Sequence, residues 1–151
     1  AVAMVAPFMI SEENPLYMVS GVFNAICVRG NMLGDSMYYG RGAGKLATAS
    51  AVVADIIDAA KHKGTNIVSL WSANKVELKD HNDVKVRYFV RVKASEDTIN
   101  HIKAHFTHLE EVEALQGEYA FITAECTEGT FKEKVEMLDS DAVISQIRIE
   151  K

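Results

Sequence analysis

The residues best placed to do chemistry form a glycine-rich run, Gly40-Arg41-Gly42-Ala43-Gly44-Lys45, directly ahead of a predicted helix. Glycines let a backbone approach a ligand closely, and the free amides and positive dipole at a helix start favour phosphate. The run is not a Walker loop, because Gly40 lies too close to Gly44 and Leu46 replaces Ser or Thr. Nor is it a complete GxGxxG fingerprint, since Ala47 holds the place of the third glycine. Two interpretations are open: a nucleotide-phosphate site, or a tight turn without a ligand.

Histidines form the second group that could do chemistry. His101 and His105 are one helical turn apart, so they could face the same metal ion, and His108 follows closely. A third and fourth ligand are not evident, and the histidines fall beside the apolar stripe that contains Ile102 and Phe106. We therefore expect a solvated helix face and predict no metal site.

Carboxylates are abundant, but none is placed as a catalytic acid. Glu110, Glu111 and Glu113 have the pattern of the polar face at the start of a strand, and Asp55 and Asp58 belong to the helix after the glycines. No nucleophile has a partnered base. The sequence therefore predicts no catalytic residue in this chain.

Strands and one helix must position the glycine-rich run. The apolar opening, residues 1–10, is expected to be a buried strand, too short to span a membrane and without the basic flank of a signal peptide. A helix is expected from Thr48, capped by Thr48 or Ser50 and closed by Gly64. The other expected elements are a turn at 11–15, strands at 18–28 and 32–39, the loop 40–44, and an apolar segment at 65–71.

The second half has the pattern strand, helix, strand, strand, helix, strand. Val86, Tyr88, Val90 and Val92 alternate with polar residues, as in a half-buried strand. The later elements are a helix with apolar positions 99, 102, 106 and 109, a hairpin of 112–115 and 119–126 around Gly117, a helix with positions 131, 135 and 138, and a strand at 143–149. This βαββαβ order predicts a ferredoxin-like α+β unit with two helices on one face of an antiparallel sheet.

Composition fits a cytoplasmic globular protein. Of 151 residues, 48% are hydrophobic and 25% charged, and the two cysteines, Cys27 and Cys126, are expected to be small buried strand residues. The net charge of −5 argues against nucleic-acid and anionic-membrane partners. Residues 1–75 hold six Lys/Arg against five Asp/Glu, whereas residues 76–151 hold ten against sixteen. This contrast predicts two domains, 1–75 and 84–151, joined by a linker at 76–83.

Two sequence blocks carry a resemblance to a known family. The first is Gly21-Val22-Phe23-Asn24-Ala25, and the second runs from Tyr39-Gly40-Arg41-Gly42-Ala43-Gly44 to Thr48-Ala49-Ser50-Ala51-Val52-Val53-Ala54-Asp55. Together, with their spacing, they resemble the closing signature of bacterial homoserine dehydrogenases over about the first 65 residues. Arg41 and Ala47 depart from the family pattern, as does Asn14, which stands where the family usually has His. Because the chain opens at Ala1 without Met, we expect it to be the C-terminal part of a longer polypeptide.

The resemblance implies a function for the parent protein. Homoserine dehydrogenases are oxidoreductases that reduce aspartate semialdehyde to homoserine with NAD(P)H, in threonine, methionine and isoleucine biosynthesis. Carried over by position, Gly42, Ala43 and Gly44 would contact the cofactor, and Arg41 would either reach its phosphate or be solvated. The family's catalytic Lys and Asp and its Rossmann fingerprint have no counterpart here. We therefore expect this α/β part by itself to be inactive and to bind no cofactor tightly.

The second half resembles an ACT domain, a ferredoxin-like regulatory module that binds amino acids between paired copies. The resemblance implies a homo-oligomer, dimer or tetramer, with threonine as an allosteric effector. Ala94, Glu96 and Asp97 fall where the family has an Asp-x-Pro-Gly turn, and carboxylates there would repel the carboxylate of a ligand. The alternative function is a stand-alone amino-acid sensor or dimerisation module without catalysis.

Overall fold

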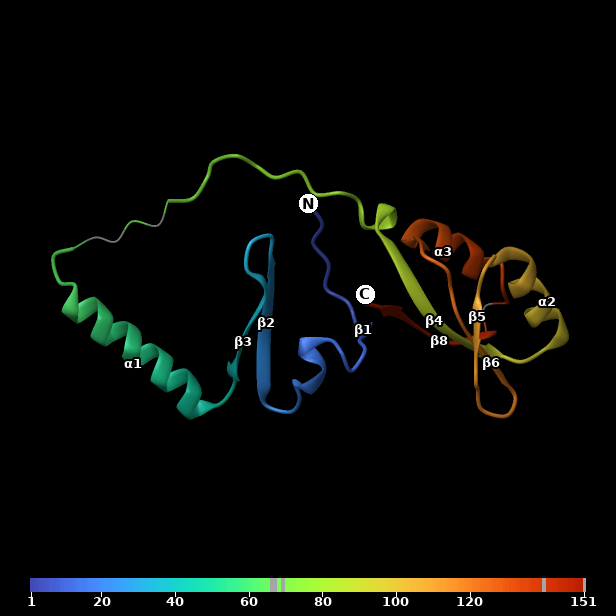
Figure 1. Cartoon of the computed structure of the whole chain (residues 1–151), viewed down its shortest axis with the longest axis horizontal. Helices are drawn as coiled ribbons and strands as arrows, with labels where there is room; N and C mark the ends of the chain where they lie inside the picture. Colours follow the sequence, from blue (N-terminus) through green and yellow to red (C-terminus); the bar gives the residue numbers. More distant parts are fainter. Residues whose placement is uncertain (66–67, 69, 140, 151) are drawn as a thin grey trace. The chain divides into compact units, whose positions relative to one another are not determined.

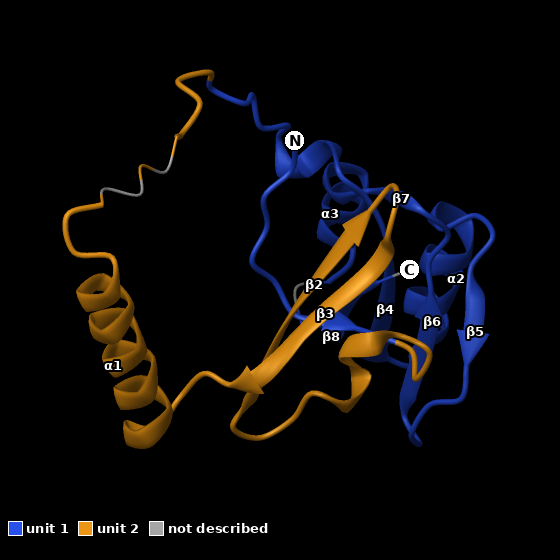
Figure 2. Ribbon diagram, turned by 60° about the vertical axis from the view of Figure 1, so that its left-hand side comes forward, with its two compact units in different colours: residues 1–10, 75–151 blue, residues 11–74 orange. Residues whose placement is uncertain are grey.

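In a computed structural model that describes residues 1–65, 68, 70–139 and 141–150, the chain forms two compact units. Unit 1 contains residues 1–10 and 75–151, and unit 2 contains residues 11–74 (Figure 2). The compact units thus place residues 1–10 with the second half of the chain, whereas the sequence assigned them to the first. The domain division at 1–75, 76–83 and 84–151 stays a prediction.

The sheet of unit 1 joins strands from both ends of the chain (Figure 1). Its order is β1-β8-β4-β6-β5, and β1 is parallel to β8 while the other pairs are antiparallel. The predicted strand and helix order is observed, and the short β7 is an addition that pairs with the start of β4. In chain order the elements are β1 (Phe8–Met9), β4 (Lys85–Lys93), α2 (Glu96–His105), β5 (Glu110–Val112), β6 (Glu118–Ile122), β7 (Cys126–Thr127), α3 (Glu128–Glu136) and β8 (Val143–Ile149).

The core of unit 1 follows from the alternation on β4. Tyr88, Val90 and Val92 are buried, and they pack in one cluster with Ile102 of α2 and Phe131 of α3, so both helices cover the same face of the sheet. Phe106 and Phe121 complete the cluster. Tyr88 stacks on Phe131 with ring centroids 3.6 Å apart. Each helix begins at a side-chain cap, Ser95 for α2 and Thr127 for α3, as expected for hydroxyl residues at helix starts.

The N-terminal segment is not the buried strand that the sequence predicted. Only Phe8 and Met9 form a strand, and Val5 is fully exposed. The segment lies at the edge of the sheet, where only one neighbour, β8, is available to pair with it. Apolar composition alone therefore predicted more burial than this segment has in the structure.

Unit 2 contains a short 3-10 helix at Pro15–Met18, a hairpin of β2 (Phe23–Gly30) and β3 (Gly34–Arg41), and helix α1 (Lys45–Lys61). The hairpin was predicted, with both strands shifted by a few residues. Helix α1 begins three residues before Thr48, so the predicted Thr48 and Ser50 caps are wrong. The C-cap is His62, and Gly64, with φ +87°, follows two residues later. Part of the predicted segment 65–71 lies outside the described residues.

Solvent surrounds the apolar side of α1 within the described structure. None of its residues is buried, and Val52, Val53, Ile56 and Ile57 are each about half exposed or more. Across the described ranges, every helix falls short of the length and apolarity that a membrane crossing requires.

Candidate functional site

The glycine-rich run divides between a strand and a link. Gly40 and Arg41 belong to β3, where they pair with Asn24 and Phe23 of β2, and Gly42, Ala43 and Gly44 form the link to α1. The start of β2 and the end of β3 border a cavity of about 270 Å³, lined by residues 24–26 and 38–42. Hairpin pairing thus brings two distant blocks of the sequence to one place.

Asn24 lies against Gly42. A β-carbon added at Gly42 would be 2.9 Å from Asn24 Nδ2, closer than such contacts occur without a shift. No added β-carbon at Gly40 would meet any atom within 4 Å. The glycine at position 42 therefore makes room for the Asn24 side chain.

Gly44 is where the backbone turns into α1. Its φ of +112° is a conformation that residues with side chains rarely adopt. It is the N-cap, no side chain caps the helix, and the first helical bond runs from Thr48 N–H to Gly44 O at 3.0 Å. The first-turn amides and the positive end of a 17-residue helix are thus left for an acceptor outside the helix.

Arg41 lies on an aromatic surface. Its guanidinium carbon is 5.2 Å from the centroid of the Phe23 ring, and Phe23 stacks on Tyr39 with centroids 4.9 Å apart. Arg41 is exposed, as expected for a solvated side chain, and it also makes a cation–π contact with Phe23. The predicted contact with a cofactor phosphate stays a prediction. Sequence reasoning did not single out Asn24, Phe23 or Tyr39 as site residues, although all three stand in the quoted blocks.

The histidine and carboxylate candidates from the sequence contact side chains or backbone close to them. His101 and His105 stack with ring centroids 4.1 Å apart, and His105 Nδ1 lies 2.9 Å from the carbonyl oxygen of His101. In the part of the chain that the structure describes, no cluster of three His, Cys, Asp or Glu residues could hold a metal. Glu110 pairs with Arg87 and Glu111 with Lys103.

An ion pair lies at the turn end of the hairpin. Arg29 Nε donates to Asp35 at 2.8 Å, and this hydrogen bond lowers the pKa of Asp35 below 3.8. These residues pair next to the turn, at the opposite end from Phe23 and Arg41. The Arg29–Asp35 pair therefore supports the hairpin and takes no part at the glycine link.

Both cysteines lie in strands, Cys27 in β2 and Cys126 in β7, and both are half-buried free thiols. Burial raises the pKa of the Cys126 thiol. A raised thiol pKa disfavours the reactive thiolate, as expected for a packing residue.

Comparison with protein families gives one match. A model of homoserine dehydrogenase matches residues 1–57. The homoserine dehydrogenase of Helicobacter pylori is 40% identical over 93 residues, which are 62% of this chain and 22% of that protein. The Neisseria gonorrhoeae enzyme is 56% identical over 57 residues, 38% of this chain and 13% of that protein. The chain thus spans about a fifth of the length of the curated relatives or less.

Solved structures extend the likeness to the second half. A homoserine dehydrogenase from Thiobacillus denitrificans superposes with a TM-score of 0.72 at 25% identity, over 97% of this chain and 38% of that one. One from S. aureus, at pH 6.0, gives a TM-score of 0.63 at 29% identity, over 94% of this chain and 36% of that one. Over residues 1–57 the chain thus matches the homoserine dehydrogenase family model, and over longer stretches it is similar to homoserine dehydrogenases in sequence and in fold.

Proposed function

We propose that the chain is the C-terminal portion of a homoserine dehydrogenase and that its residues 42–44 form part of the nicotinamide nucleotide site. The parent enzyme would reduce L-aspartate 4-semialdehyde to L-homoserine with NAD(P)H. The observation that carries the proposal is the link itself, in which Gly42 and Gly44 occupy positions where a side chain meets Asn24 or strains the backbone.

The residues of the link fit a nucleotide. A backbone without side chains at positions 42 and 44 admits close approach, and the open first-turn amides of α1 supply donors for an anionic group. Asn24 borders the same cavity and offers an amide donor and acceptor. The nucleotide, when bound, supplies the hydride, and the role of this chain is to bind and orient.

The apolar side of α1 is exposed, and this supports the idea that another part of the parent enzyme packs against it. Packing of an amphipathic face, rather than propensity, supplies most of the stability of a protein helix. We propose that other parts of the parent enzyme, which the matched relatives contain beyond the shared region, cover Val53, Ile56 and Ile57. We therefore expect the chain alone to be inactive.

We further propose that unit 1 is an ACT-type regulatory domain with the ferredoxin-like fold. The strand order β8-β4-β6-β5 with two helices on one face supports it. Such a domain would pair with a second copy, giving a dimer or tetramer. Glu96 and Asp97, which belong to the predicted effector turn, lie in the first turn of α2, so a ligand carboxylate would meet two acidic groups there.

The second candidate function is an amino-acid sensor or dimerisation module without catalysis. One observation favours it: the buried core lies wholly in unit 1, so that unit has the means to fold without unit 2. Calorimetry with threonine discriminates the two roles of that unit. A binding heat that saturates as threonine is added supports the sensor role. No binding heat at roughly millimolar threonine leaves dimerisation as the role of unit 1.

The test of the main proposal uses the full-length enzyme from the same gene. NADPH oxidation with aspartate semialdehyde is expected for the full-length enzyme, and none for the 151-residue chain. Gly44→Val is expected to raise KM for the nucleotide about tenfold or more, because a β-branched residue cannot adopt φ +112° without strain. Gly64→Val is the matched control, since Gly64 also has a positive φ, of +87°, but lies beyond the other end of α1 and does not line the cavity. An unchanged KM in Gly44→Val would contradict the assignment.

A further inference from the structure

Unit 1 contains a second cavity, of about 360 Å³, at the place where the N-terminal segment passes the ends of α3 and β8. One wall is residues 3–7, and the other is His81, Glu128 and Arg148. The cavity shares no residue with the site at residues 24–44, and it lies within one compact unit.

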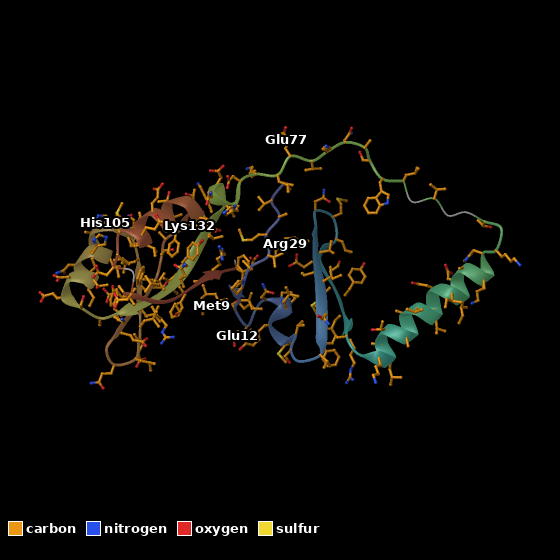
Figure 3. All side chains as sticks on the ribbon, turned by 180° about the vertical axis from the view of Figure 1, so that it is seen from behind. Met9, Glu12, Arg29, Glu77, His105 and Lys132 are labelled. Atoms are coloured by element: carbon orange, nitrogen blue, oxygen red, sulfur yellow. The ribbon has the colours of Figure 1, made fainter. Side chains whose placement is uncertain are left out.

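The polar wall is built around a buried carboxylate. Glu128 is only 3% exposed, and it accepts from Arg148 Nη2 at 2.7 Å and Nε at 3.3 Å. Lys132 Nζ lies 3.2 Å from the same carboxylate (Figure 3 labels Lys132 on α3). Two cations thus compensate one buried carboxylate, and of the two only Arg148 lines the cavity.

Arg148 has donors to spare. A guanidinium carries five N–H groups, and the bonds to Glu128 use only Nε and Nη2. The Glu128 carboxylate therefore does not use Nη1. The Tyr88 ring centroid lies 5.6 Å from Arg148 Cζ, and the contact with Tyr88 helps to raise the pKa of Arg148. Nη1 is thus the donor of this wall that the ion pair with Glu128 leaves available.

The opposite wall is the N-terminal segment, which makes backbone hydrogen bonds only near its two ends. The Ala1 ammonium donates to Glu77 O and Lys79 N–H donates to Ala1 O, while Glu150 N–H donates to Met9 O (Figure 3 labels Glu77 and Met9). Between these hydrogen bonds, residues 2–6 make no backbone hydrogen bond to other described residues. Their amides and carbonyls are open beside the cavity, and their side chains are apolar.

We propose that this cavity binds a small molecule with a carboxylate on a short apolar body. The carboxylate would accept from Arg148 Nη1 and from open amides of the N-terminal segment, and the apolar body would lie against Met4 and Ala6, which are half-buried. The volume lies at the lower end of the range for ligand cavities, roughly 300–1,000 Å³, which excludes large ligands.

This place differs from the effector turn predicted at residues 94–97. That turn follows the C-terminal end of β4, whereas His81 precedes β4 and Arg148 pairs with Tyr88 in the first half of that strand. An occupant would connect the N-terminal segment to the core of unit 1. A bound ligand would therefore stabilise the N-terminal segment, which makes few hydrogen bonds to the rest of the sheet.

The test is a titration of the 151-residue chain with butyrate, followed by amide NMR. Binding is expected to shift the amides of residues 3–6 and the Arg148 Nε–H signal, and to saturate at roughly millimolar butyrate. Butylammonium, with the same body and the opposite charge, is expected to cause no shift. Absence of saturating shifts with butyrate would overturn the proposal, and equal shifts with inorganic phosphate would overturn the requirement for an apolar body.

Two variants separate the cavity from a general charge effect. Ala6→Leu adds bulk to a half-buried lining residue, so butyrate affinity is expected to fall about tenfold or more. Val76→Leu is the matched control, because Val76 is exposed and does not line the cavity, and it should bind like the parent chain. Unchanged Val90 and Val92 signals would show that each variant keeps the core. Equal affinity in Ala6→Leu and the parent chain would contradict the cavity.

These outcomes are independent of the proposed dehydrogenase role. The butyrate experiment uses only residues of unit 1, and the Gly44→Val experiment uses only the glycine link. Failure of either one therefore leaves the other intact.

Discussion

The side-chain amide of Asn24 on β2 lies 2.9 Å from the position that a β-carbon of Gly42 would occupy. The contact joins the two sequence blocks that are separated by the whole hairpin, and it places the Asn24 amide at the start of the link to α1. A small side chain at position 42 would have to displace Asn24.

The first prediction concerns this contact. Gly42→Ala is expected to displace the Asn24 side-chain amide at a cost of about 0.5 kcal/mol or less in stability, because Asn24 is exposed and the amide is the free end of its side chain. The NMR signal of the Asn24 side-chain amide should move. Gly40→Ala should leave that signal in place, because its β-carbon would meet no atom within 4 Å. An unmoved Asn24 signal in Gly42→Ala would refute the contact.

The second prediction concerns the buried ion pair. Arg148→Met is expected to cost about 3–5 kcal/mol, because it leaves the buried Glu128 carboxylate without its main partner. Lys93→Met, which breaks the exposed pair with Asp141, should cost about 0–1 kcal/mol. Urea unfolding of both variants gives the comparison. Equal costs would mean that Glu128 keeps access to water.

The third prediction concerns acid. Burial raises the pKa of Glu128, but hydrogen bonds from Arg148 and Lys132 outweigh it and hold that pKa below 4.5. A lowered carboxyl pKa stabilises the fold above the unfolded-state pKa, and the stabilisation disappears as the pH falls through the folded-state pKa. The free energy of unfolding should therefore fall below about pH 4.5, and less steeply in Glu128→Gln. Glu133→Gln, on the exposed side of α3, should keep the parent slope.

The fourth prediction concerns Tyr119. Burial, and after it the charge and hydrogen bonding of the neighbouring Glu111 carboxylate, raise the pKa of Tyr119 to about 12. Because the unfolded-state pKa is near 10, this group stabilises the fold below pH 10, and the contribution is lost as the pH rises towards 12. Absorbance titration of tyrosinate should show a late step that Tyr119→Phe removes. Tyr38→Phe, at an exposed position, should leave it.

The fold of the second half was predictable because its pattern of apolar and polar residues agrees with the burial of those residues in the structure. On β4, alternation placed Tyr88, Val90 and Val92 on the core face, and all three are buried. Gly117, with φ +85°, marks the hairpin turn that was expected there. The short β7 was missed, because two residues that pair with the start of another strand leave no periodicity in the sequence.

The first half was less predictable, since its partners are distant or outside the chain. Residues 1–10 are apolar but lie mostly exposed at a sheet edge, and α1 begins before its expected caps because Gly44 serves as N-cap. The glycine positions were found from their spacing. Asn24 was not, because its role depends on hairpin register, which brings residue 24 opposite residue 40.

The fifth prediction follows from the difference between the units. Amides of α1 should exchange with solvent much faster than those of Val90 and Val92, because no residue of α1 is buried while both valines are fully buried. Hydrogen exchange followed by mass spectrometry measures this directly. In the full-length enzyme, α1 should gain protection. Equal protection in the chain and the enzyme would argue against a covering neighbour for α1.

The parallel pairing of β1 with β8 also sets an order of events in the cell. Met9 pairs with Ile149, so during synthesis β1 waits for a strand that is made about 140 residues later. At roughly 5–20 residues per second, that interval lasts on the order of 10 s, during which the apolar N-terminal segment has no edge to join. A factor that shields nascent apolar segments would act on residues 1–10 in that interval.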